Sequence, residues 1–107
     1  MANFMIIYHG SGNMGSMTQD EGMAHRGKWM DWVKSLGKAV VSPGQPLKGN
    51  TMLSSSGASA PEGDHKISGY AVIEAVDMAA ALEMAKGDPF LDMGGSIEVA
   101  EMVVMGG

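Results

Sequence analysis

The sequence predicts a single α+β domain of the ferredoxin-like βαββαβ kind, in which two helices cover one face of an antiparallel sheet. Three observations support this fold class. First, 107 residues suffice for one domain with one hydrophobic core, which we assign to residues 1–107. Second, apolar residues recur with strand or helix periods in the order strand, helix, strand, strand, helix, strand. Third, glycine and proline separate these segments.

The chain opens with a predicted strand, residues 3–9, that has apolar side chains on both faces. Phe4 and Tyr8 would face one way, whereas Met5 and Ile7 would face the other. Because a small domain has helices enough to cover one face of its sheet, the second face is left bare. We therefore predict a homodimer in which two copies pair through this sheet face.

A helix is predicted to follow a glycine-rich loop at residues 10–17. Thr18 and Glu21 have the spacing of a capping box, in which hydroxyl and carboxylate satisfy each other's backbone donors. Gly37 supplies the left-handed stop. The apolar stripe of this helix repeats every three or four residues and consists of Trp29, Trp32, Val33 and Leu36, with His25 on the same stripe.

The middle of the chain is predicted to hold little regular structure beyond one short strand. That strand covers residues 38–42 and ends at Pro43-Gly44. Residues 45–53 are typical of extended edge structure interrupted by proline and glycine. Residues 54–64 are rich in serine and glycine, which predicts a solvated loop at a hairpin tip.

The second half of the chain repeats the pattern of strand, helix and strand. Residues 66–75 are predicted to form a strand, and Asp77 is predicted to cap a second helix that ends at Gly87. Residues 96–105 form the predicted closing strand. This order places both helices on one side of the sheet.

Composition excludes several classes of function. The chain has 12 acidic and 7 basic residues, with a net charge of -5 and no basic cluster, so nucleic-acid binding is not expected. It has no cysteine, which excludes disulfides and thiolate metal ligands. The first eight residues lack a basic segment and their apolar run is too short for a signal peptide or a membrane span, so we expect a cytoplasmic protein without membrane partners. No cofactor is implied.

One glycine motif resembles a nucleotide-binding loop but lacks its context. Residues 10–15 match G-x-G-x-x-G directly after a strand, a pattern that can hold a pyrophosphate at a helix N-terminus. The capping box at Thr18 starts the helix after the last glycine, and the chain is too short for a dinucleotide fold. We therefore do not predict nucleotide binding.

Several ordered stretches resemble the YCII-related family. They are FMIIYHG, LGKAVVSPGQPL, GYAVIEA and KGDPFLDMGGSIEVAEM, which together span nearly the whole chain. The resemblance implies a dimeric α+β barrel and says little about the reaction. It also implies an active-site pair of a first-helix histidine and an aspartate before proline, which here correspond to His25 and Asp88. Arg26 is the alternative occupant of the histidine position.

The pair His25 and Asp88 is chemically plausible as a catalytic site. A carboxylate that accepts a hydrogen bond from one imidazole nitrogen leaves the other nitrogen free for acid–base chemistry near neutral pH. The structural alternative is a hydrogen-bonded core histidine and an aspartate that forms a turn before Pro89. The sequence leaves both readings open.

A ligand pocket is predicted between the first helix and the sheet, where a small apolar or aromatic molecule would bind. Its candidate residues are Tyr8, His9, Trp29, Trp32 and Pro46. The three histidines of the chain are too scattered to predict a metal site.

Three functions remain open from the sequence. The first is a small enzyme that acts on an apolar or cyclic molecule through His25 and Asp88. The second is a ligand-binding or stress-associated module, whose Met and Trp residues would form an adaptable pocket without chemistry. The third is a structural domain that binds another protein through its sheet.

Overall fold

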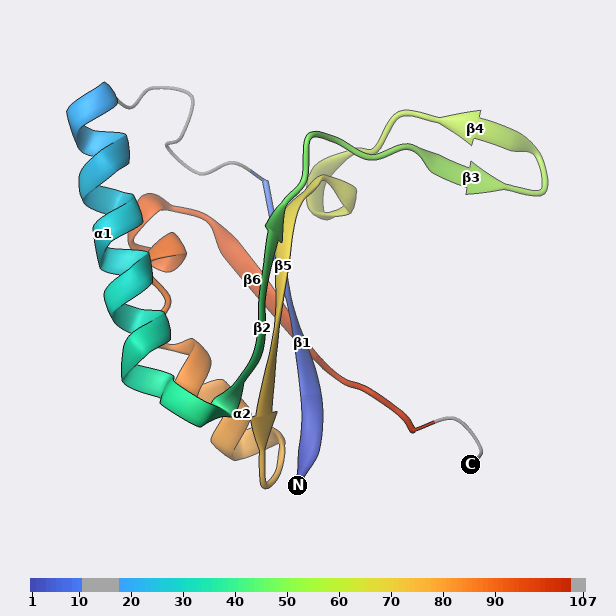
Figure 1. Cartoon of the computed structure of the whole chain (residues 1–107). Helices are drawn as coiled ribbons and strands as arrows, with labels where there is room; N and C mark the ends of the chain where they lie inside the picture. Colours follow the sequence, from blue (N-terminus) through green and yellow to red (C-terminus); the bar gives the residue numbers. More distant parts are fainter. Residues whose placement is uncertain (11–17, 105–107) are drawn as a thin grey trace.

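The structure, a computed structural model, describes residues 1–10 and 18–104, and the six predicted core elements occur in the predicted order (Figure 1). They are β1 (Ala2–His9), α1 (Gln19–Leu36), β2 (Val40–Pro46), β5 (Ile67–Ala75), α2 (Met78–Ala85) and β6 (Ser96–Glu101). Most predicted boundaries agree to within one or two residues, because caps and turn formers mark them in the sequence.

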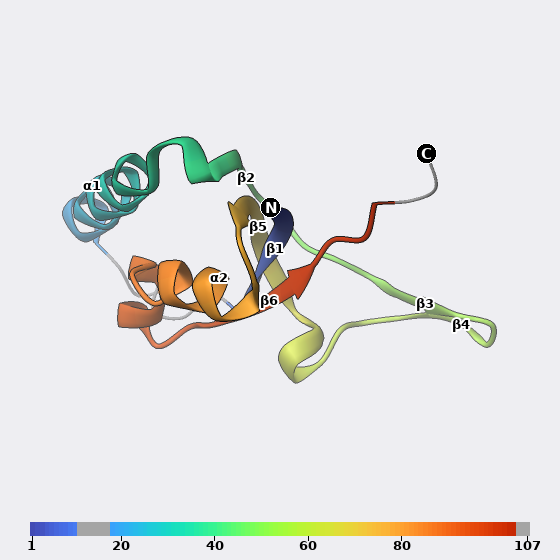
Figure 2. The same cartoon turned by 90° about the horizontal axis from the view of Figure 1, so that it is seen from below.

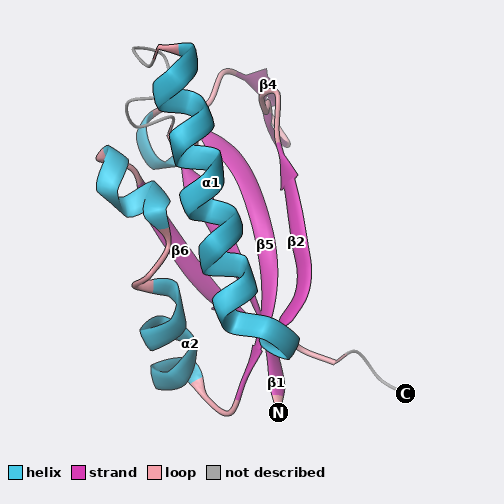
Figure 3. Cartoon of the chain, turned by 60° about the vertical axis from the view of Figure 1, so that its left-hand side comes forward, coloured by secondary structure: helices cyan, strands magenta, loops and turns pink. Residues whose placement is uncertain are grey.

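The main sheet has the strand order β2-β5-β1-β6, and its described neighbours are all antiparallel. Helices α1 and α2 both lie on one face of this sheet, and the other face carries no helix of the described chain (Figures 2 and 3). This arrangement is the α+β, ferredoxin-like fold that the sequence predicts.

Strand β1 lies in the centre of the sheet and separates the core from the open face. Phe4 and Ile6 are fully buried beneath the helices, opposite Ile73 and Ala71 of β5. Ile7, the residue after Ile6, points to the other face and is half-buried. The predicted two-sided strand is therefore confirmed, because side chains alternate across a pleated strand.

Helix α1 begins with the predicted capping box. The Glu21 amide donates to Thr18 Oγ1 at 3.1 Å, and the Thr18 amide donates to Glu21 Oε1 at 3.2 Å. The helix ends at Gly37, which has a φ of +56°. Asp77 caps α2 in the same way, since its Oδ1 accepts from the Ala80 amide at 2.8 Å. These caps fix where both helices begin.

The middle of the chain differs from its prediction. A 3₁₀ turn occupies Gly37–Ala39, and β2 then continues through Pro43-Gly44, where the sequence predicts its end. Edge strands tolerate proline, and two irregularities in the pairing of β2 with β5 accommodate the change in direction. Strand β2 can therefore carry residues 43–46 alongside β5.

Residues 54–64, predicted as a loop, contain a strand. Strand β4 (Gly57–Ser59) pairs with β3 (Met52–Ser54) in a separate two-stranded sheet. The tight turn between them is stabilised by the Ser54 hydroxyl, which lies 2.8 Å from that of Ser56. The prediction of a hairpin tip is confirmed, but the strand pairing was missed because serine and glycine have low strand propensity. The hairpin projects from the body (Figure 1).

The closing strand is shorter than predicted. Strand β6 ends at Glu101, which pairs with Phe4 of β1, and β1 has almost no residues left to pair beyond that point. Met105, the predicted end, lies outside the described residues, as does the glycine motif apart from Gly10. In the part of the chain that the structure describes, no helix is long and apolar enough to span a membrane.

Candidate functional site

The site is centred on a buried carboxyl group, that of Asp88, whose residue is 1% exposed. Asp88 follows α2 and caps a 3₁₀ turn at Pro89–Met93, where its Oδ1 accepts from the Phe90 amide at 2.9 Å. Proline at the first position of this turn has a fixed φ that favours the turn. The turn-forming role considered in the sequence is therefore present in the structure.

The second oxygen of this carboxyl group accepts a hydrogen bond from the Tyr8 hydroxyl. Tyr8 lies near the end of β1, 80 residues earlier in the chain. The ring of Phe90 packs edge-on against that of Tyr8, with centroids 5.2 Å apart and planes at 82°. Because this packing restricts the phenol ring, the hydroxyl is held in place over the carboxyl group.

Both members of this pair have shifted titration. Burial raises the pKa of Asp88, although the Tyr8 hydroxyl, the Phe90 amide and the charge of His25 all oppose the shift. Burial also raises the pKa of Tyr8, and its hydrogen bond to Asp88 and the carboxylate charge raise it further. Tyr8 therefore remains protonated throughout the physiological pH range.

A pocket of about 480 Å³ opens in front of Tyr8, between the first half of α1 and the strands β2 and β5. Its wall is largely apolar and includes Met23, Trp29, Pro43, Pro46 and Phe90. The polar residues of the lining include Gln19, His25 and Arg26 from α1, and the strands add others. Pockets of this size and composition are typical of sites for small organic ligands.

Helix periodicity explains why α1 forms one wall of the pocket. His25 and Trp29 lie four residues apart and therefore on one side of the helix, and Arg26 lies next to His25. Both His25 and Arg26, the two alternatives for the family's histidine position, line the pocket. The register of the helix therefore does not decide between them.

The structure brings together most of the predicted site residues, but not in the predicted contacts. Tyr8, His25, Trp29 and Pro46 all line the pocket. Asp88 lies behind Tyr8, and within residues 1–10 and 18–104 its carboxyl oxygens bond to Tyr8 and the Phe90 amide, with no hydrogen bond to His25. His25 acts on Asp88 only through its charge.

Trp32, which we predicted to line the pocket, is instead buried between the helices. It is 8% exposed, and its indole Nε1 donates to the Met84 carbonyl at 3.1 Å. This bond joins α1 to the end of α2. Trp32 lies on the same stripe as Trp29, but it is nearly one turn further along the helix and about 60° around it, where it meets α2.

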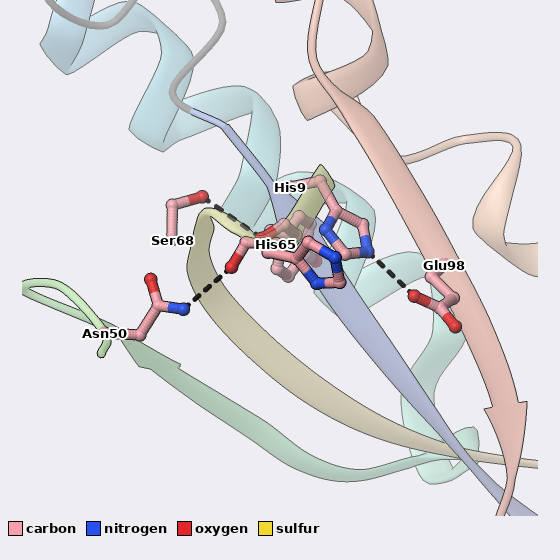
Figure 4. Close-up of polar contacts among 6 residues, drawn as sticks. His9, Asn50, His65, Ser68 and Glu98 are labelled. Atoms are coloured by element: carbon pink, nitrogen blue, oxygen red, sulfur yellow. Dashed lines mark hydrogen bonds and ion pairs between the residues drawn. The ribbon is translucent and has the colours of Figure 1, made fainter. Parts of the chain in front are cut away.

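His9 is likewise outside the pocket wall. Its Nε2 lies 2.8 Å from Glu98 Oε1 on β6, and Figure 4 shows the imidazole directed at that carboxylate. The other ring nitrogen, Nδ1, is buried without a hydrogen-bond partner among the described residues. Successive side chains of a strand point to opposite faces of the sheet, so His9 and Tyr8 lie on different faces.

The contact between Tyr8 and Asp88 was missed in the sequence, as was the part that Phe90 and Pro43 play in the wall. The Tyr8 contact has no local signal, because 80 residues separate its two partners. Phe90 comes directly after Asp88-Pro89 in the sequence, and this position next to a predicted site residue could have indicated that Phe90 lines the pocket. No group of three histidine, cysteine or acidic side chains suited to a metal ion occurs in the described ranges.

Replacing Asp88 with asparagine should change how stability depends on pH. Burial raises the pKa of Asp88 in the folded protein above its unfolded value of 3.8. As the pH rises from 3.8 through the pKa of the folded state, ionisation of Asp88 therefore lowers the free energy of unfolding. Asparagine cannot ionise. We therefore expect the melting temperature of Asp88→Asn to gain on that of the wild type as the pH rises from 3.8 toward neutral. Thermal melts across this range test it, and a difference that does not vary with pH would contradict it.

Comparison with known proteins agrees with this fold. The family model of the YCII-related domain matches residues 1–105. The chain belongs to the YCII-related family. The match covers both helices and the whole main sheet, and the resemblance seen in the sequence is thereby confirmed. No curated protein matches this YCII-related chain.

A solved structure shares the fold of the YCII-related chain. It is the 5-chloro-2-hydroxyhydroquinone dehydrochlorinase from Burkholderia phenoliruptrix AC1100, in complex with 2,5-dihydroxybenzoquinone. The two are 15% identical, with a TM-score of 0.54, and the match covers 94% of this chain and 93% of the other. At this identity the likeness shows the fold alone, which is the ferredoxin-like fold of dimeric α+β barrels.

Proposed function

We propose that the chain is a small enzyme that acts on an apolar or cyclic small molecule by acid–base chemistry. His25 would transfer the proton, and Asp88 would support it. The observation that carries this proposal is a largely apolar pocket of about 480 Å³ with an imidazole in its wall and a buried carboxyl group behind it. Pockets with a few convergent polar groups and shifted titration are typical of active sites.

The geometry suits proton transfer at the wall formed by α1. An imidazole can accept or donate a proton near neutral pH, and general acid–base catalysis needs such a group within reach of the substrate. The charge of His25 lowers the pKa of Asp88 and so opposes the effect of burial, which shows that the two groups interact electrostatically. Asp88 would thus act through charge and through Tyr8, since it makes no direct hydrogen bond to His25.

The solved structure with the same fold supports the choice of substrate class. That protein is named as a dehydrochlorinase of a chlorinated, hydroxylated ring, and it was solved with a cyclic quinone. Here the wall of Trp29, Phe90 and Pro46 would pack against such a ring through its faces and edges. We therefore favour a planar cyclic substrate over a flexible chain.

Turnover of cyclic compounds by His25→Ala and Asp88→Asn tests the proposal. For a substrate found with the wild type, we expect His25→Ala to lower kcat by about 10²- to 10⁴-fold, because acid–base catalysis contributes that much. Asp88→Asn should have a smaller effect, since Asp88 acts indirectly. His65→Ala is the matched control, because His65 is exposed and lies outside the pocket wall. The proposal fails if no ring compound is turned over, or if His25→Ala matches the wild type.

A binding module without chemistry is the second candidate, favoured by the largely apolar wall and by Met23, a flexible side chain, within it. It predicts ligands that raise the melting temperature of the wild type and of His25→Ala alike. Stabilisation without turnover would therefore replace the enzyme proposal with this one.

The open face of the sheet supports the proposal that two copies pair. Met5 and Ile7 of β1 lie on this face opposite Val72 and Tyr70 of β5, and β6 adds Ala100. Except for Val72, these side chains remain half-buried in the single chain, although no helix of residues 1–10 and 18–104 covers them. A second copy with the same apolar face would cover this surface about a twofold axis.

A further inference from the structure

The hydrogen of the Tyr8 hydroxyl is already used inside the protein. It is donated to Asp88 Oδ2, while Asp88 Oδ1 accepts from the Phe90 amide. A phenol has one hydrogen to donate and two lone pairs that can accept. Tyr8 therefore has no hydrogen left for a ligand in the pocket that it lines, and its oxygen is an acceptor there.

The effect of Trp29 on the pKa of Tyr8 agrees with an accepting role for the Tyr8 oxygen. An indole N–H can only donate, and the Trp29 side chain lowers the pKa of Tyr8, as a donor to the phenol oxygen would. Both residues line the same pocket.

We propose, on the basis of the function proposed above, that the ligand is a ring bearing a neutral hydroxyl group and that this hydroxyl donates its hydrogen to the Tyr8 oxygen. The carboxyl group of Asp88 fixes the direction of that hydrogen bond, so Asp88 and Tyr8 together act as positioning residues. An ether or a deprotonated ring oxygen has no hydrogen to donate and would meet the lone pairs of Tyr8 with the Asp88 carboxylate behind them.

Binding of naphthol and its methyl ether tests this selection, because the two rings differ in the donor. We expect isothermal titration calorimetry of the wild type to show naphthol binding about three- to tenfold more tightly, the net contribution of one hydrogen bond. Tyr8→Phe keeps the ring that packs on Phe90 but removes the oxygen. In that variant the preference for naphthol should disappear, while the methyl ether still binds.

Asp88→Asn gives a second test that does not remove the phenol. The Phe90 amide needs an acceptor, so the carboxamide oxygen should take that place and turn its NH₂ group toward Tyr8. The Tyr8 oxygen would then accept from this group, and its hydrogen would turn toward the pocket. We expect the preference for naphthol to vanish or to reverse in favour of the methyl ether.

The outcomes separate this inference from the enzyme proposal. Equal binding of both rings by the wild type, or a preference for naphthol that survives Tyr8→Phe, would overturn the hydroxyl selection and leave the ring pocket intact. If neither ring binds the wild type, the pocket proposal and this inference both fail. Unfolding of Tyr8→Phe, seen by circular dichroism, would leave Asp88→Asn to decide.

Discussion

Gly44→Ala is expected to destabilise the protein by at least about 2 kcal/mol and to abolish ligand binding. Gly44 has a φ of +72°, where side chains are strained, and an added Cβ would overlap the Tyr70 carbonyl oxygen of β5. Backbone cannot move aside as a flexible side chain can, so β2 would have to separate from β5. Gly44 also lines the pocket, which would lose its wall. Urea unfolding measures the loss of free energy.

Gly94→Ala is the matched control for this change. Gly94 has a similar φ, +79°, but an added Cβ would meet no atom within 4 Å. It should therefore show only the cost of the left-handed backbone, about 1–2 kcal/mol. The difference between the two variants isolates the contact with β5. Equal losses would show that strand β2 adjusts to the extra methyl group.

Ile7→Glu is expected to convert a dimer of the wild type into monomers. Ile7 lies in the middle of the open face, directly opposite Glu98 of β6, so a second carboxylate would add repulsion to the loss of apolar surface. The core side of the same strand is untouched, because Ile6 and Phe4 point the other way. Sedimentation equilibrium of both proteins measures the change in mass.

The control for this experiment is Met30→Glu, an equal exchange of apolar for acidic on α1, where Met30 is 48% exposed. That variant should remain a dimer. A wild type that sediments as a monomer at all concentrations would contradict the pairing, and so would an Ile7→Glu variant that stays dimeric. Circular dichroism confirms that both variants keep their helices and strands.

Local signals in the sequence determined the elements and most of their boundaries. The capping box at Thr18 and Glu21 and the cap at Asp77 depend on residues within one turn of each other, so spacing alone reveals them. The alternation in β1 likewise separated Phe4 and Ile6 from Met5 and Ile7, but both sets are apolar, and only the structure decided that Phe4 and Ile6 enter the core. The resemblance to the YCII-related family likewise depended on short continuous stretches of sequence, such as FMIIYHG and GYAVIEA.

Predictions were wrong where neighbouring strands override local preference. Pro43-Gly44 ends a strand in most contexts, yet β2 continues because irregular pairing with β5 accommodates both residues. Residues 57–59 have low strand propensity and still form β4, because β3 supplies the pairing partner. In both cases the deciding hydrogen bonds come from another segment.

The sequence by itself determined the fold class and placed Tyr8, His25, Trp29 and Pro46 near one another, since helix and strand periods put them on facing surfaces. Only the tertiary structure decided that Asp88 holds Tyr8 and not His25, because that contact spans 80 residues. The same applies to the bond from Trp32 to Met84. Such contacts depend on how elements distant in the sequence pack against each other, and local residue patterns do not predict that packing.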